Sequence, residues 1–342
     1  MDKFKKIASL DELEALKNLI HYENSGEHKP QDMREKLLCD FTKPVGKIKS
    51  ISESSGTLRI ASFTLTNAET AKLIKEADVA LENGAEYIEI VPESVEKLTC
   101  KEYFNAYCEC AIAIKAAHPE IKVGSGGFEN CVSDYVHEFM NYLANDKRVP
   151  LDFFSWHKCA AKAEQVQNYT YAARTLLDKY GFGETENIIS SWRYDAVDIS
   201  NVKLQMKEAA FVAATLISLQ KTPADMAVYG KENFGESEKC RLAFSAFGML
   251  SSLGIEVTSD SAADHVYVLG AKNDDKGAFM AVNFNPYEEA EHECVLDLKG
   301  IFGKSCEIYL LDEAHNLEVV YSGKVPESYK LFANSVMVVK LI

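Results

Sequence analysis

The sequence has no apolar run that approaches the ~20 residues needed to cross a bilayer, and its first residues lack the apolar centre of a signal peptide. It also lacks an excess of positive charge, since 37 lysines and arginines stand against 52 aspartates and glutamates, for a formal net charge of −15. Such a surface repels the phosphates of nucleic acid. We therefore expect a cytoplasmic protein with neutral or weakly charged ligands and with no membrane or nucleic-acid partner.

Disulfide and metal patterns are missing as well. Nine cysteines are scattered without a CxxC pair, and the eight histidines show no HExxH spacing. An odd number of dispersed cysteines indicates reduced thiols rather than a disulfide framework. We expect no metal and no cofactor, and the sequence gives no indication of an oligomeric state.

From residue 45 onward, short β-branched or aromatic runs alternate with helical stretches. Strands are expected at 45–51, 57–64, 86–91, 121–126, 151–157, 187–192 and 225–230. Helices such as 67–84 fit between these nearly continuous apolar runs, which is typical of a parallel sheet covered on both faces. We expect a (β/α)8 TIM-type barrel of seven or eight strands, irregular or incomplete at its N-terminal end, with a further helix within residues 1–40.

The pattern changes near residue 265. Short strands separated by turns are expected at 265–272, 277–285, 292–298, 305–312, 317–323 and 335–342, with almost no helical period. Such a series is typical of an antiparallel β-sandwich. We expect a barrel domain over residues 1–264 and a small β-sandwich over residues 265–342, joined without a low-complexity linker.

The stretch YIEIVPES, residues 87–94, ends an expected strand with a glutamate. Glu89 and Val91 alternate with two isoleucines, and Pro92 stops the ladder just before Glu93. Barrel enzymes carry their catalytic residues at such carboxyl ends, and enzymes that cleave glycosidic bonds use two carboxylates there. Glu93 is therefore a candidate proton donor, although a glutamate at a strand end is usually just solvated.

Several segments resemble, in chain order, the motifs of clan-A glycoside hydrolases, in particular family 39 and its β-xylosidase-like relatives. YIEIVPES resembles the Y-F-E-I-W-N-E-P motif, with Glu93 at the acid/base glutamate. Residues 101–127 resemble a helix followed by a strand that ends K-V-G-G, and VPLDFFSWHKCA at 149–160 resembles a D-F-x-S-W-H-x-Y segment. The likeness covers roughly residues 85–285 and implies a barrel with a β-sandwich that takes a carbohydrate ligand in the barrel mouth.

The resemblance fails at the second carboxylate. The family's nucleophile lies in a strand that ends T-E-W or N-E-W, whereas NIISSWRYD has Ser191 in place of the glutamate, before Trp192. The asparagine that precedes the acid/base residue is replaced by Pro92, and the Tyr-Gly-Lys of residues 229–231 stands where relatives have Tyr-Tyr-Asp. What the resemblance implies is a glycoside hydrolase-like protein whose retaining mechanism is doubtful.

The substrate-binding residues that the resemblance favours are Trp156, His157, Ser191, Trp192 and Tyr229. An aromatic face and a polar ring suit a cleft that holds a hydroxyl-rich sugar. The alternative is that the histidine is a satisfied structural residue and that Trp192 only fills the barrel mouth.

Two functions remain open. In the first, Glu93 donates a proton to the leaving oxygen of a glycoside, and Asp195, Glu232 or Glu129 activates an attacking water molecule. In the second, the chain is a catalytically inactive pseudoenzyme that binds a carbohydrate or a partner, because the loss of one member of a catalytic pair usually costs orders of magnitude in rate.

Overall fold

A computed structural model describes residues 48–49, 60–65, 70–82, 84–92, 95, 97–195, 201–229, 237–259, 261, 263, 265–273, 276–286, 294–298 and 304–342. The helix expected within residues 1–40 lies outside these residues. Glu93 and Glu232 also lie outside them.

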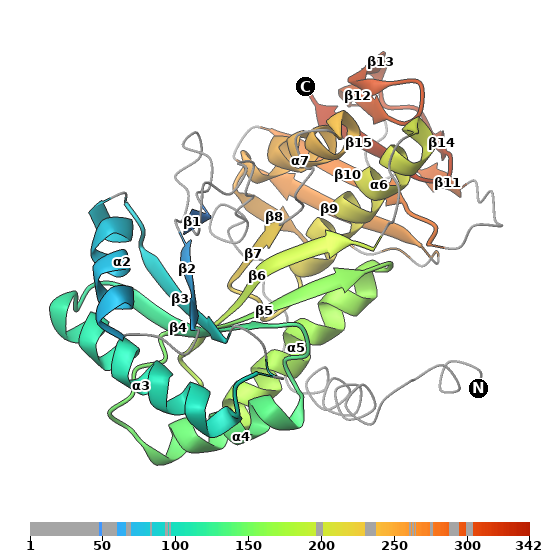
Figure 1. Cartoon of the computed structure of the whole chain (residues 1–342). Helices are drawn as coiled ribbons and strands as arrows, with labels where there is room; N and C mark the ends of the chain where they lie inside the picture. Colours follow the sequence, from blue (N-terminus) through green and yellow to red (C-terminus); the bar gives the residue numbers. More distant parts are fainter. Residues whose placement is uncertain are drawn as a thin grey trace, which may run out of the picture.

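A parallel sheet forms the first part of the molecule (Figure 1). Its strands, in spatial order, are β1 Ile48–Lys49, β2 Ile60–Leu65, β3 Tyr87–Pro92, β4 Lys122–Phe128, β5 Phe153–Ala160, β6 Glu186–Tyr194 and β7 Met226–Tyr229. Strands β2 to β7 are parallel neighbours in chain order, whereas β1 pairs antiparallel with β2. The predicted barrel-type α/β fold is confirmed, and its irregularity falls at the N-terminal end. The described residues supply six parallel strands and do not close the barrel.

Helices follow the strands as the alternating pattern predicted. They are α2 Thr70–Glu82, α3 Cys100–Ala117, α4 Asp134–Asn145, α5 Ala163–Lys179, α6 Val202–Leu219 and α7 Glu238–Ser251. Polar caps fix where several of them begin; Thr99, for example, forms a capping box with Glu102 at the start of α3. None of the helices in the described part of the chain is long and apolar enough to cross a membrane.

The second part is the expected antiparallel β-sandwich. Its larger sheet has the order β13-β12-β15-β10-β9-β8, and β11 pairs with β14 in a small second sheet. The strands are β8 Ile255–Val257, β9 Val266–Lys272, β10 Gly277–Asn283, β11 Cys294–Asp297, β12 Ser305–Leu311, β13 Asn316–Lys324, β14 Ser328–Leu331 and β15 Ser335–Leu341. Because β8 pairs with β9, this sheet includes a strand that precedes residue 265. The division into residues 1–264 and 265–342 stays a prediction.

Helices α6 and α7 join the two parts (Figure 1). Phe211 of α6 contacts Phe284, just beyond β10, with ring centroids 5.8 Å apart. Lys239 in the first turn of α7 is buried, and its Nζ donates to the backbone oxygen of His315 at 2.9 Å and to Oδ1 of Asn316 at 2.6 Å. Burial lowers the pKa of Lys239. The parallel sheet and the sandwich therefore share a packed and hydrogen-bonded interface.

The two faces of the parallel sheet carry different residues because side chains alternate along a strand. On the outer face, residues such as Ile88, Phe154 and Ile189 belong to the main core with the helices. On the inner face, a separate buried cluster is formed by Tyr87, Phe153, Ile188, Met226 and Val228. Neighbouring residues of one strand therefore lie in different environments. A shift of one residue along the strand moves a side chain from the helices to the barrel interior.

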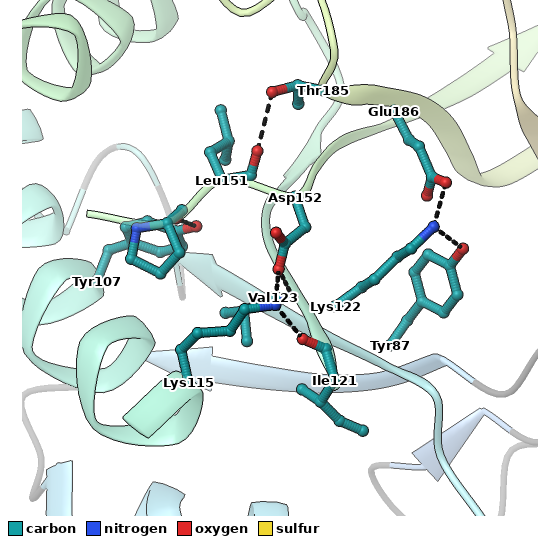
Figure 2. Close-up of polar contacts among 11 residues, drawn as sticks. Tyr87, Tyr107, Lys115, Ile121, Lys122, Val123, Leu151, Asp152, Thr185 and Glu186 are labelled. Carbon is teal, nitrogen blue, oxygen red and sulfur yellow. Dashed lines mark hydrogen bonds and ion pairs between the residues drawn. The ribbon is translucent and has the colours of Figure 1, made fainter. Parts of the chain in front are cut away.

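A group of polar contacts lies at the amino ends of the strands of the parallel sheet (Figure 2). Lys122 of β4 forms an ion pair with Glu186 of β6 and lies 3.0 Å from the hydroxyl oxygen of Tyr87 of β3. Beside them, Lys115 Nζ lies 2.7 Å from the Asp152 carboxylate. These contacts join β3, β4 and β6, and α3 with the start of β5, at the amino ends of the strands, where barrels carry stabilising rather than catalytic residues. A functional site is therefore expected at the opposite, carboxyl ends of the strands.

The buried hydrogen bonds of Asn187 on β6 provide a test of the packing on the outer face of the sheet. Its Oδ1 accepts a hydrogen bond from Trp156 Nε1 at 2.8 Å, and its Nδ2 donates to the backbone oxygen of Thr170 at 2.8 Å. Asn187→Leu leaves the buried indole N–H unpaired, so we expect the free energy of unfolding to fall by about 2–4 kcal/mol in urea denaturation. Asn145→Leu, at the exposed end of α4, is the control and should change it by less than about 0.5 kcal/mol. Equal losses would contradict this role of Asn187.

Candidate active site

The inner face becomes polar above its apolar cluster. Glu89 of β3 is fully buried, and the hydroxyl of Ser155 on β5 donates to its carboxylate at 2.6 Å. Gly126 lies between them on β4, where an added Cβ would come within 2.0 Å of the Ser155 hydroxyl oxygen. The glycine thus lets β4 run close against β5. The hydrogen-bonded pair of Glu89 and Ser155 therefore lies at the base of the site formed by the carboxyl ends of the strands.

Gly127 brings β3 and β5 together at the next level. Its φ of +69° lies in the left-handed region, and an added Cβ would lie 2.7 Å from Cγ1 of Val91 and 3.6 Å from Cε1 of His157. His157 therefore lies close to Val91, the last inner-face residue of β3 before Glu93. The structure places this predicted site residue at the carboxyl edge and leaves it half-buried.

An irregularity in β6 sets the position of Ser191. Trp156 pairs with Ile189, but the next residue of β5, His157, pairs with Ser191, so Ser190 is an extra residue in the ladder. Directly paired residues of neighbouring strands share a face. The structure therefore brings His157 and Ser191 together on the inner face, and Ser191 is also half-buried.

A second pair lies nearer the rim. Cys159 of β5 is in register with Arg193 of β6, and both side chains are exposed. The thiol of Cys159 donates to Oδ1 of Asp195 at 3.4 Å. Burial of the sulfur atom, helped by this hydrogen bond, raises the pKa of Cys159, while Arg193 opposes the shift. Cys159 is thus held as a neutral thiol, and Asp195, one of the three proposed bases, lies at the exposed end of β6.

The outer face of the sheet carries the side chains of Trp156, Trp192 and Tyr229. All three are at most 1% exposed and belong to the core between the sheet and the helices. The rings of Trp192 and Tyr229 lie 4.8 Å apart, and the hydroxyl of Tyr229 donates to Oε1 of Glu208 on α6 at 2.6 Å. Burial raises the pKa of Tyr229 far above its ordinary value. The three aromatic residues thus pack between the sheet and the helices, so Trp192 does not fill the barrel mouth as the alternative had it, and contact of the three residues with a ligand stays a prediction.

Four inner-face residues were missed by the sequence analysis: Glu89, Ser155, Cys159 and Arg193. Ser155, Cys159 and Arg193 each lie two residues from His157 or Ser191, and Glu89 lies four residues before Glu93. Two-residue alternation could have placed Glu89 and Ser155 on the inner face. Arg193 could not be placed in this way, because the extra residue in β6 changes the alternation. Among the described residues no three His, Cys, Asp or Glu side chains form a group that could hold a metal ion. The expectation of no metal and no cofactor stays a prediction.

Comparisons with known proteins give a family match over part of the chain. Residues 93–183 match the family model of "Glycosyl hydrolases family 39". The match begins at Glu93, includes β4 and β5, and ends before β6. Over 76 residues the chain is 31% identical to the beta-xylosidase of Geobacillus stearothermophilus, a stretch that is 22% of this chain and 15% of that protein. This match therefore spans only a small part of that curated relative.

Solved structures share the fold over most of the chain. The glucosidase from Croceicoccus marinus superposes with a TM-score of 0.65 at 15% identity, over 90% of this chain and 87% of that one. A GH39 beta-xylosidase from Caulobacter crescentus gives a TM-score of 0.56 at 15% identity, over 80% and 71%. The alpha-L-arabinofuranosidase from Thermotoga maritima gives 0.59 at 14% identity, over 82% and 75%. These likenesses, all below 25% identity, show a TIM-barrel and β-sandwich fold, and the likeness to family 39 itself comes from the match over residues 93–183.

Gly127 provides the test of this site geometry. In Gly127→Ala the new Cβ meets Val91 in a backbone conformation that alanine rarely adopts, so we expect the free energy of unfolding to fall by about 1–3 kcal/mol. Gly183→Ala is the matched control, because an added Cβ there meets nothing within 4 Å. Thermal denaturation of both variants checks the prediction. If Gly127→Ala were as stable as the control, the close approach of β3, β4 and β5 would be wrong.

Proposed function

From the relationship to family 39, we propose that the chain binds a glycoside or oligosaccharide at the carboxyl ends of β3 to β6, with Glu93 as the proton donor to the leaving oxygen. The observation that carries this proposal is the pairing of His157 with Ser191 on the inner face, beside the end of β3. The family match that begins at Glu93 supports the role given to that residue.

Ser191 determines which chemistry remains. The retaining route needs a carboxylate to attack the anomeric carbon, and a serine hydroxyl is a poor replacement because its sugar adduct is less favourable than that of a carboxylate. The shorter side chain leaves space on the inner face for a second reactant. Water activated by Asp195, Glu129 or Glu232 is one such reactant, and Asp195 lies closest in sequence, at the end of the same strand.

A pseudoenzyme is the second candidate. It is favoured by the packing of Trp156 and Trp192 in the core, because no stacking platform then remains from the two tryptophans of the chain. In that case the same edge binds a carbohydrate or a partner without turnover. The two candidates differ in their chemistry and share the binding site.

We also propose a reducing, cytoplasmic location. Cysteines such as Cys100, Cys131 and Cys306 are buried and form no disulfide. Burial raises the pKa of Cys131 to about 12, so this thiol stays protonated and unreactive. Free, buried thiols of this kind suit a reducing compartment.

The test restores the missing carboxylate. We expect the native chain to bind aryl glycosides in phosphate-free buffer, as measured by calorimetry, and to release aryl alcohol slowly. Ser191→Glu should raise that release by at least about a hundredfold because it supplies the nucleophile. Adding Glu93→Gln to Ser191→Glu should remove the gain, since general acid catalysis typically contributes about 10²–10⁴-fold.

The control is Ser245→Glu, which adds the same charge at an exposed position of α7 and should leave the rate of the native chain unchanged. Rapid release by the native chain that collapses in Glu93→Gln would exclude the pseudoenzyme. Failure of both the native chain and Ser191→Glu to bind any aryl glycoside would refute the proposal itself.

A further inference from the structure

Strands β5 and β6 carry four hydrogen-bond donors on the inner face of the carboxyl edge. They are the paired residues His157 and Ser191 and, one level nearer the rim, the paired residues Cys159 and Arg193. We call these four residues the donor set. Strands lie about 4.8 Å apart and rise about 3.3 Å per residue, so the four Cα atoms mark out roughly 5 by 7 Å. This area matches one tetrahedral oxyanion.

The chemistry of the donor set suits an anion. The guanidinium of Arg193 is a permanent cation whose planar fork pairs with phosphate oxygens in bidentate fashion. The hydroxyl of Ser191 and a ring N–H of His157 are further donors, whereas the single hydrogen of the Cys159 thiol is donated to Asp195. The raised pKa of Cys159 keeps its thiol protonated, so this residue adds no negative charge. None of the four residues is a carboxylate.

A buried hydroxyl lies next to the donor set. Ser190, the extra residue of β6, is only 3% exposed, and its Oγ has no hydrogen-bond partner among the described residues. Three carboxylates act in the opposite sense. Asp195 accepts the Cys159 thiol, and Glu129 is exposed just after β4. Glu89 is buried on the inner face of β3, where it accepts from Ser155. The remaining negative charge of the chain is screened over about 8 Å at physiological ionic strength.

We propose that inorganic phosphate binds the donor set and attacks the anomeric carbon in place of the missing carboxylate, which makes the chain a glycoside phosphorylase. This inference rests on the proposed function. A carboxylate at position 191 would repel the phosphate, whereas Ser191 both removes that charge and leaves room for the attacking oxygen.

The reaction balances without another reactant. A phosphate oxygen forms a bond to the anomeric carbon as the glycosidic C–O bond breaks, and Glu93 gives its proton to the leaving oxygen. The products are a glycosyl phosphate and an alcohol. The proton that remains on the bound hydrogen phosphate returns to Glu93, so the enzyme is regenerated and no oxidant or reductant takes part.

The experiment measures phosphate binding and the formation of glycosyl phosphate separately. Titration calorimetry gives the affinity of the native chain for inorganic phosphate, and phosphorus NMR follows the formation of glycosyl phosphate from an aryl glycoside. We expect Arg193→Gln to weaken phosphate binding by at least about tenfold and to abolish the product, because it removes a charged donor. Arg193→Lys should retain part of both. Arg241→Gln removes the same charge from an exposed position of α7 and should change neither.

The variant Ser191→Glu separates the two proposals. It should lose phosphate binding while it gains hydrolysis in phosphate-free buffer. If aryl glycosides bind but phosphate does not, or if phosphate binds as sulfate does and no glycosyl phosphate forms, the phosphorylase inference is wrong and the proposed function stands. If phosphate binds but no glycoside does, both are wrong.

Discussion

The candidate site depends on one extra residue in β6. With a regular register, Ser190 would pair with His157, Ser191 would face the helices, and Trp192 would project into the barrel interior. The extra residue reverses this arrangement: Ser191 and Arg193 reach the inner face, and Trp192 packs against Phe211 of α6. A bulge of this kind at a strand end re-aims side chains without changing the fold. The chemistry of the carboxyl edge follows from this local irregularity.

The inner face changes in character from one end of the sheet to the other. At the amino end, the ion pair of Lys122 with Glu186 joins β4 to β6 across β5, and a buried apolar cluster lies above it. Next comes the hydrogen-bonded pair of Glu89 and Ser155, and the half-buried and exposed donors follow at the rim. Stability is thus concentrated where the strands begin, and the polar groups that can meet a ligand are gathered where they end. This division is the one expected of an α/β barrel.

Much of the fold could be predicted from the sequence, because apolar runs, polar caps and turn residues act locally. The strands expected at 121–126 and 151–157 match β4 and β5 within a few residues, and the sandwich strands are confirmed in the same way. The short strand β8 and the strand β14, Ser328–Leu331, were missed, because so few residues carry little periodic signal. The antiparallel pairing of β1 with β2 was also missed, because the alternation of strands and helices favoured a parallel sheet throughout.

The site was harder to predict than the fold. The resemblance located Ser191 and His157 in the sequence, and both lie on the inner face. It could not show that Trp156 and Trp192 point away from them, because a family motif gives positions along the chain and no face of the sheet. Alternation from Phe154 would have placed Trp156 correctly. The bulge in β6 leaves no trace in composition or period, so the orientation of Trp192 follows only from the three-dimensional register.

The central claim is that Glu93 is retained as the proton donor, while Ser191 occupies the position of the nucleophilic carboxylate on the opposite side of the sugar. A crystal structure of the chain with a bound glycoside tests it most directly, through the separation between the Glu93 carboxyl group and the Ser191 hydroxyl. The account predicts that both face the sugar from opposite sides, roughly 6 to 10 Å apart, which leaves space for an external attacking group. A Glu93 side chain that is directed toward the outer helices, or a sugar that binds away from Ser191, would contradict it.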